Sequence, residues 1–326
     1  MEHFTFSNFS FCIRATSRLL LPAYKGSVFR GGFGHAFRRA CCTAGMKDCS
    51  SCLLRDSCVY LWIFETPVPE DTALMKKYPS APHPFILEPP LGSHQAYEPG
   101  ERLEFGLVLV GQALDYLPYF IYSFNHLGQM GIGRGKGKFV LESVSWKPFK
   151  NDSSKRVLFH KDNGEFTKPP APVTWPEIVE QVAPTKVTLS FLTPTRIKYR
   201  GRFTDQLEFH VLFRNLLRRA SLLSYFHCGF KLDDSHFPDL IEQAKEISIS
   251  DSRLHWHDWT RWSNRQQTKM KMGGIIGEIT YEGDLSPFWP YIRLGEYVHV
   301  GKGSSFGLGK YEVKKNHQNE VDHATS

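Results

Sequence analysis

Two kinds of segment are missing from this 326-residue sequence. No apolar run approaches the length that a bilayer requires, and no charged-then-apolar signal occupies Met1 to Ala15. The sequence therefore predicts a cytoplasmic protein rather than a membrane or secreted one. Its seven cysteines are then expected to be thiols or metal ligands, because disulfides are rare in that compartment.

The common nucleotide-binding motifs are also missing, although two stretches are rich in glycine. Residues 128–138 and 301–310 both lack Gly-Lys-Ser/Thr at the required spacing, and both lack the dinucleotide glycine triplet. Glycine removes the side chains that keep a backbone away, so bare amides flanked by lysine and arginine are suited to a phosphate chain. The alternative is a mobile surface turn. Because the pattern occurs twice, we favour a polyanionic backbone as ligand.

Charge and aromatic content agree with that interpretation. The formal net charge is +7 and aromatic residues make up 14% of the chain. Single-stranded nucleic acid is bound by this combination, since bases stack on rings while phosphates contact cations. Most of the 25 phenylalanines are nevertheless expected to fill cores.

Apolar periodicity predicts the same order of elements twice. The first half has expected strands at 4–13, 82–90, 103–109 and 139–146, and expected helices at 27–41 and 113–127. The second half has expected strands at 187–191, 256–262, 273–281 and 311–313, and expected helices at 209–223 and 285–294. A bulge is expected between Phe6 and Phe9, where the alternation changes register.

The order strand, helix, strand, strand, helix, strand is that of a ferredoxin-like unit. We therefore predict the α+β class, with two tandem ferredoxin-like (RRM-like) domains. The first domain covers 1–146, a polar, proline-rich linker 147–184, the second domain 185–315, and a disordered tail 316–326.

A cysteine-rich segment at about 41–60 interrupts the first domain. Cys49, Cys52 and Cys58, with Cys42 as the fourth ligand, give the number and closeness of thiolates that a tetrahedral zinc site needs. Cys41 could replace Cys42, and an iron-sulfur cluster is an alternative to zinc. Four thiolates saturate zinc, so we expect a structural zinc-binding insertion rather than a catalytic one.

Several segments together resemble a known family. They are Phe29-Arg-Gly-Gly-Phe-Gly-His35, Cys58-Val-Tyr60, Leu117-Pro-Tyr119 with the glycine-rich stretch after it, Ser263-Asn-Arg-Gln266, Gly273-Gly274 and Val298-His-Val-Gly-Lys-Gly303. This set resembles the CRISPR precursor-crRNA-processing endoribonuclease family, a repeat-cleaving family of the RAMP superfamily with a C-terminal Gly-rich loop. The resemblance implies metal-independent cleavage of CRISPR repeat RNA to a 5′-hydroxyl and a cyclic phosphate. It also implies crRNA, and further Cas subunits of an interference complex, as partners.

RNA cleavage by the 2′-hydroxyl needs groups that transfer protons, and histidine suits this near neutral pH. We predict His35 as the catalytic histidine, with Tyr24 and Lys25 beside it. His227 is a competitor, although it also has the sequence context of a buried histidine at a helix end. His299, beside the second glycine-rich stretch, is a third candidate.

Basic residues near the glycines are expected to hold RNA. The predicted RNA-binding residues are Arg30, Arg134, Lys136, Lys138, Arg265, Lys269, Lys271, Gly301, Lys302, Gly303 and Lys310. Two other functions compete with the nuclease. One is a non-catalytic RNA-binding RAMP subunit of a CRISPR effector complex, and the other is a nucleic-acid binder that reads its ligand with the cysteine segment.

Overall fold

The computed structural model describes residues 1–46, 48–49, 51–72, 74–75, 78–149, 155–180, 182–263 and 268–314. The chain divides into two compact units. Unit 1 comprises Met1–Trp175, Ser221–Leu232 and Ser305–Gly307, and unit 2 comprises Pro176–Ala220, Asp233–Ser304 and Leu308–Ser326. The expected tail at 316–326 lies outside the described residues.

Unit 1 is built on an antiparallel sheet with the strand order β3-β5-β1-β6-β7. The strands are β1 (Thr5–Ala15), β3 (Phe85–Glu88), β5 (Arg102–Val110), β6 (Phe139–Lys147) and β7 (Arg156–His160), and β8 (Val173–Thr174) also pairs with β1. A separate pair is formed by β2 (Leu19–Leu20) and β4 (Ala96–Tyr97).

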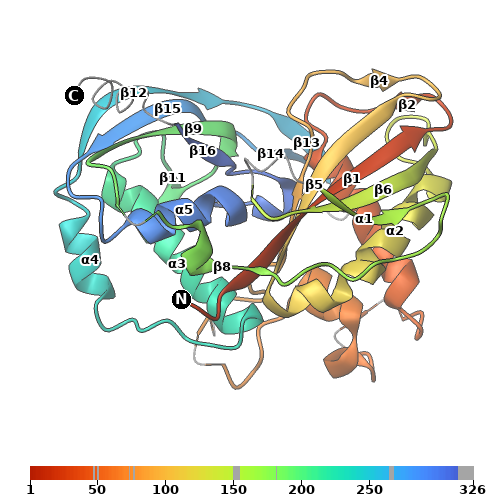
Figure 1. Cartoon of the computed structure of the whole chain (residues 1–326), viewed down its shortest axis with the longest axis horizontal. Coiled ribbons are helices and arrows are strands. Elements are labelled where there is room, and N and C mark those ends of the chain that lie inside the picture. The colour runs from red at the N-terminus through yellow and green to blue at the C-terminus, as the bar shows by residue number, and fades with distance from the viewer. Residues whose placement is uncertain are drawn as a thin grey trace, which may run out of the picture. The chain divides into compact units, whose positions relative to one another are not determined.

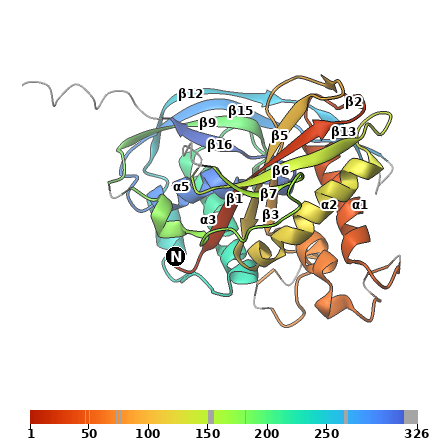
Figure 2. The same cartoon turned by 45° about the vertical axis from the view of Figure 1, so that its right-hand side comes forward.

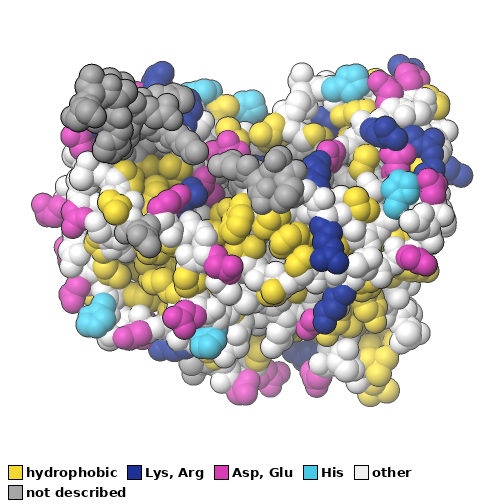
Figure 3. Space-filling view, viewed as in Figure 1, with side chains coloured by type: hydrophobic (Ala, Val, Ile, Leu, Met, Phe, Trp, Pro, Cys, Tyr) yellow, Lys and Arg dark blue, Asp and Glu magenta, His cyan; other side chains and the backbone are white. Residues whose placement is uncertain are grey.

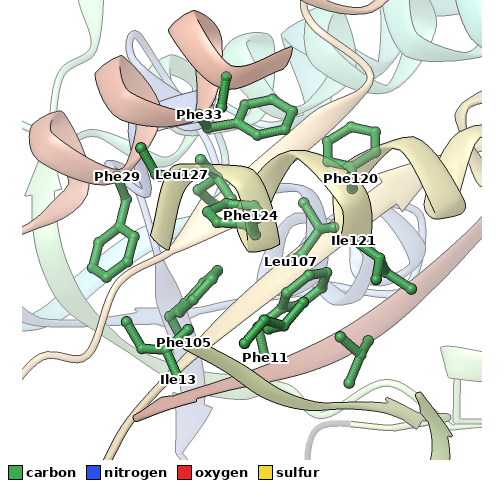
Figure 4. Close-up of a cluster of buried hydrophobic side chains, with 14 of the residues drawn as sticks. Phe11, Ile13, Phe29, Phe33, Phe105, Leu107, Phe120, Ile121, Phe124 and Leu127 are labelled. Carbon is green, nitrogen blue, oxygen red and sulfur yellow. The ribbon is translucent and has the colours of Figure 1, made fainter. Parts of the chain in front are cut away.

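Two helices cover one face of this sheet (Figures 1 and 2). They are α1 (Gly26–Cys41) and α2 (Leu117–Met130), and a 3₁₀ turn, Gly111–Tyr116, leads into α2. Phe33 of α1 stacks on Phe120 and Phe124 of α2, with ring centroids 4.9 and 5.2 Å apart. These rings continue into Phe11 and Phe105 of the sheet to form the core shown in Figure 4. The phenylalanine spacing that predicted α1 therefore marks its buried face.

Both faces of β1 are buried near its start. Phe9, Phe11 and Ile13 belong to the core under the helices. Phe6 lies on the opposite side, and Phe4, which precedes the strand, packs against Trp175 with ring centroids 5.5 Å apart. The register with β5 is continuous from Phe6 to Arg14, and the irregularity against β6 lies between Cys12 and Ile13. The bulge expected between Phe6 and Phe9 is therefore wrong, because a second buried face produced the same change in pattern.

Unit 2 has a second antiparallel sheet, with the strand order β12-β15-β9-β16. Its strands are β9 (Lys186–Thr195), β12 (Ser248–His257), β15 (Gly274–Glu282) and β16 (Tyr311–Lys314). The helices are α3 (Phe209–His227), whose residues from Ser221 belong to unit 1, α4 (Phe237–Gln243) and α5 (Trp289–Val298). Phe209 and Phe213 of α3 pack edge-on against Phe288, with centroids 5.1 and 4.8 Å apart.

Some elements differ from the sequence prediction. The strand expected at 256–262 is broken, since β12 ends at His257 and β13 (Thr260–Ser263) begins a separate hairpin with β14 (Thr268–Lys271). At the break, Trp256 Nε1 donates to Asp258 Oδ1 over 2.8 Å. The expected linker at 147–184 contains β7, which pairs with β6 and buries Leu158, so these residues belong to the sheet. Another short hairpin, β10 (Lys198–Tyr199) with β11 (Arg202–Phe203), was not predicted.

In the part of the chain that the structure describes, none of the helices combines the length and the apolar character needed to cross a bilayer.

Candidate functional site

Helix α1 carries an exposed strip on the side away from the core. Gly31, His35 and Arg39 follow one another at four-residue spacing, which places them on one face of a helix, and all three are exposed. A Cβ atom at Gly31 would meet no heavy atom within 4 Å. His35 is therefore flanked on this strip by open space at Gly31, one turn earlier, and by the cation of Arg39, one turn later.

The neighbouring glycines of α1 have a different role. A Cβ atom at Gly32 would lie 2.9 Å from Leu127 Cδ1, and one at Gly34 would lie 2.2 Å from Phe64 Cζ. Both glycines are needed so that α2 and the Phe64 ring can approach α1. Of the three glycines before His35, Gly31 alone is free of such a contact.

The two residues predicted to assist His35 are engaged elsewhere in unit 1. Tyr24 donates its hydroxyl to the Phe306 carbonyl over 2.7 Å, and burial raises the pKa of its phenol well above the usual range. Lys25 is 0% exposed, and its Nζ donates to the carbonyls of Ala23 and Gly92 over 3.2 and 2.9 Å. Burial lowers the pKa of this ammonium group. The structure thus separates Tyr24 and Lys25 from the exposed strip.

The two competing histidines are buried. His227 is 1% exposed, and its Nε2 lies 2.6 Å from the Pro82 carbonyl. His299 is 0% exposed, and its Nδ1 lies 3.1 Å from the Leu308 carbonyl, which can only accept a hydrogen bond. Among the three predicted histidines, His35 alone is accessible to a large substrate.

The first glycine-rich stretch presents its cations to solvent. Arg134, Lys136 and Lys138 are exposed, and none of them makes an ion pair with any residue that the structure describes. Its glycines mostly serve the fold. A Cβ atom would lie 2.1 Å from the Lys136 carbonyl at Gly131, 2.2 Å from the Leu20 carbonyl at Gly133 and 2.3 Å from the Arg18 carbonyl at Gly137. The stretch is therefore a tightly packed turn with charged side chains outside.

The second stretch is packed in the same way. A Cβ atom at Gly301 would lie 2.6 Å from the Arg196 carbonyl, and one at Gly309 would lie 1.8 Å from the Val300 carbonyl. At Gly303 it would lie 3.0 Å from the Leu308 side chain. Lys302 is exposed and Lys310 is half-buried. Close packing therefore also explains why glycine is needed at these positions, and the role of their amides in binding a ligand stays a prediction.

Two further predicted cations lie in unit 2. Lys269 and Lys271 belong to β14, and Lys271 is exposed. Its carbonyl accepts a hydrogen bond from Arg196 Nη1 over 3.2 Å. Arg265 lies outside the described residues.

Arg30, predicted to bind RNA, is half-buried and contacts several protein groups. Its guanidinium carbon lies 4.4 Å from the centroid of the Phe64 ring and 4.5 Å from that of Phe306. Its Nε donates to Ser305 Oγ over 3.0 Å, and its Nη2 lies 3.0 Å from His83 Nε2. Sequence reasoning missed His83, whose signal is the alternation of His83, Phe85 and Leu87 on one side of β3. Arg39 was expected on an outer face of this helix but was not among the predicted RNA-binding residues, although its helical spacing from His35 indicates it.

Cationic and acidic side chains are interspersed on the face drawn in Figure 3. Unit 1 contains such a mixture on its sheet. A cavity of about 340 Å³ is lined by Arg102, Lys155, Glu104 and Glu142, among others. Glu142 accepts hydrogen bonds from Arg102, which with the charge of Arg14 lowers its pKa to about 2. The modest net charge of the chain is therefore not gathered into one cationic surface on this side.

The four predicted zinc ligands line one small cavity. Cys42, Cys49, Cys52 and Cys58 surround a space of about 20 Å³, whereas Cys41 does not line it. Across the described residues, no three or more His, Cys, Asp or Glu side chains are arranged to hold a metal ion. The thiols are thus neighbours without the geometry of a ligand set, and zinc stays a prediction.

Comparisons with known proteins agree with the resemblance seen in the sequence. The sequence model described as the AF_1859_N N-terminal domain matches residues 4–171, and that of the CRISPR-associated endoribonuclease Cas6 matches residues 189–311. An uncharacterized protein of Archaeoglobus fulgidus is 24% identical over 298 residues, which are 90% of this chain and 93% of that protein.

Solved structures share the fold. A product complex of Cas6 (TTHB231) has a TM-score of 0.57 at 17% identity and covers 95% of this chain and 99% of its own. The structure of Thermus thermophilus Cas6 (TTHB231) has a TM-score of 0.54 at 16% identity, with the same coverage of both chains. A chain of a partial Cas6-RT-Cas1–Cas2 complex gives 0.56 at 17% identity, covering 97% of this chain and 47% of that one. The AF_1859_N model matches just over half of the chain, so the chain belongs to that family, while residues 189–311 match the CRISPR-associated endoribonuclease Cas6 model and the whole chain shares the fold of solved Cas6 structures.

Proposed function

We propose that this protein is an endoribonuclease that cuts CRISPR repeat RNA in the precursor transcript to make mature crRNA. The observation that carries the proposal is the exposed His35 on α1, in a chain that matches the Cas6 model over residues 189–311 and whose two other candidate histidines are buried. The family model that matches residues 189–311 describes an endoribonuclease, which supports RNA as the ligand class.

The proposed reaction uses a nucleophile that RNA itself supplies. His35 takes the proton from a 2′-hydroxyl, whose oxygen attacks the adjacent phosphorus. The bond from phosphorus to the 5′-oxygen breaks, that oxygen takes a proton from water, and the His35 imidazolium gives its proton to the hydroxide that remains. The products are a 2′,3′-cyclic phosphate and a 5′-hydroxyl, so no oxidant or co-reactant is consumed.

Two neighbours of His35 fit this chemistry. Arg39 lies one turn further along the exposed strip, where a cation can stabilise the charge that develops on the phosphorane. Gly31 leaves room for a ribose-phosphate strand to approach the helix one turn earlier. His35 is expected to contribute roughly 100-fold to 10,000-fold to the cleavage rate, as general acid-base groups do.

The exposed cations of the first glycine-rich stretch are proposed to hold the RNA backbone. Arg134, Lys136 and Lys138 make no ion pair with a described residue, so phosphates would not have to displace a carboxylate. Lys302 is proposed for the same role in unit 2. The support is thus side-chain charge rather than bare glycine amides.

We also propose that each unit is a ferredoxin-like domain. Both have the chain order strand, helix, strand, strand, helix, strand, and both sheets place the first strand between the third and fourth. In unit 1 these strands are β1, β3, β5 and β6, and in unit 2 they are β9, β12, β15 and β16.

The experiment uses repeat RNA with and without one 2′-deoxy nucleotide at the cleavage position, in EDTA. The proposal predicts a 5′-hydroxyl and a cyclic phosphate from the ribose substrate and no cut in the deoxy substrate. RNA that binds tightly yet stays intact would favour the non-catalytic RAMP subunit. Cutting of the deoxy substrate would contradict the 2′-hydroxyl mechanism.

A further inference from the structure

The guanidinium of Arg30 has several of its contacts inside unit 1. Its Nε donates to Ser305 Oγ over 3.0 Å, and the Phe64 and Phe306 rings both lie within cation-π distance. Arginine has donors only, so His83 Nε2, 3.0 Å from Nη2, accepts the hydrogen bond. In the neutral ring Nδ1 then carries the proton and donates to Thr66 Oγ1. This chain of contacts fixes the plane of the guanidinium.

The segment that Arg30 contacts is Ser305–Gly307, which belongs to unit 1. Ser305 is 5% exposed, and the Phe306 carbonyl accepts the Tyr24 hydroxyl. Gly26 lets that carbonyl approach closely, since a Cβ atom there would lie 2.0 Å from it. Gly307, with φ of +83°, packs against the Leu87 carbonyl and Pro89. The segment is therefore held at each of its three residues, and Arg30 provides the charged contact.

We infer that Arg30 is a positioning residue that holds Ser305–Gly307 in place, and that it does not bind a phosphate. The inference rests on the proposed function where it concerns catalysis, because the segment lies within the glycine-rich stretch proposed to be near RNA. A lysine cannot replace Arg30, since it lacks the planar fork that reaches Ser305 and His83 together while packing on the rings. A displacement of about 1 Å in a substrate-positioning segment can cost on the order of 100-fold in rate.

The first test needs no RNA. Chymotrypsin is added to the native protein, and cleavage after the half-buried Phe306 is followed by mass spectrometry. We expect Arg30→Lys to accelerate this cut by roughly tenfold to 100-fold, as expected when a hydrogen bond from a charged donor is lost. Ser305→Ala removes the acceptor of the Arg30 hydrogen bond and keeps the Arg30 cation, and it should also accelerate the cut after Phe306.

A matched control lies on the same helix. Arg38 also donates to a backbone carbonyl, that of Met46, and also lies over a ring, that of Tyr60 at 5.6 Å. Arg38→Lys should leave the cut after Phe306 unchanged. Equal acceleration in Arg38→Lys and Arg30→Lys would overturn the inference, as would no acceleration in Arg30→Lys and Ser305→Ala.

The second test separates positioning from phosphate binding. The dependence of RNA affinity on salt should keep its slope in Arg30→Lys and Arg30→Ala, whereas loss of a phosphate contact lowers the slope by about 0.7. Single-turnover cleavage should fall on the order of 100-fold in both variants. A lowered slope in Arg30→Ala would overturn the inference. A wild-type protein that does not cut at all would refute the proposed nuclease, while the chymotrypsin result would still decide the role of Arg30.

Discussion

Two glycines on one turn of α1 should respond in opposite ways to the same added methyl group. A Cβ atom at Gly31 meets nothing within 4 Å, whereas one at Gly34 would lie 2.2 Å from Phe64 Cζ. Alanine is favoured over glycine in a helix by about 1 kcal/mol. Gly31→Ala should therefore stabilise the protein by about 1 kcal/mol. At Gly34 the same gain is outweighed by overpacking, which typically costs about 1–3 kcal/mol.

Thermal unfolding of the two variants measures this contrast. For a chain of this size we expect Gly31→Ala to raise Tm by about 2–4 °C and Gly34→Ala to lower it. Gly31→Ala also places a methyl group one turn before His35, on the strip proposed to meet RNA. Cleavage should therefore fall even though stability rises. A Gly31→Ala protein that is less stable, or a Gly34→Ala protein that is more stable, would refute this account of the helix surface.

Three further predictions concern charge and metal. Arg102 hydrogen-bonds Glu142 and lowers its pKa from 4.5 to about 2, so the stability from this carboxylate is present above pH 4.5 and lost as pH falls towards 2. The pKa shift corresponds to about 3 kcal/mol of unfolding free energy, which solvent screening reduces to about 1–2 kcal/mol because Arg102 is largely exposed. Denaturant titrations of Glu142→Gln should no longer show this acid-dependent component of stability. Replacing Arg134, Lys136 and Lys138 by alanine together should lower the salt slope of RNA binding by about 2, and an unchanged slope would remove these side chains from the RNA site. Metal analysis of the purified protein should find zinc that disappears in a Cys49→Ser, Cys52→Ser double variant, and absence of zinc from the wild type would contradict the predicted insertion.

Sequence periodicity was sufficient for much of the fold. The spacing of Phe29, Phe33 and Phe37 predicts α1, and the structure buries all three. The alternation of Leu103, Phe105, Leu107 and Leu109 predicts β5 in the same way. Periodicity fails where both faces are buried, as at the start of β1, or where a polar contact such as Trp256 to Asp258 ends a strand.

The candidate site was less accessible to sequence reasoning, because burial and close packing depend on distant residues. Glycine content alone cannot distinguish a backbone bared for a ligand from one packed against neighbouring backbone, as at Gly309 against Val300. The contact of Arg30 with Ser305 joins residues 275 positions apart, and no local pattern indicates it. His35 differs, since the helical pattern that buries Phe33 and Phe37 also places it outside.

Single-turnover cleavage of repeat RNA by His35→Ala, with the dissociation constant measured in parallel, tests the central claim most directly. His126→Ala is the matched control, because His126 is a half-buried helical histidine stacked on Tyr122 and lies outside the proposed site. We predict a rate loss of roughly 100-fold to 10,000-fold in His35→Ala with little change in RNA affinity, and neither effect in His126→Ala. A His35→Ala protein that cuts repeat RNA at the wild-type rate would contradict the account.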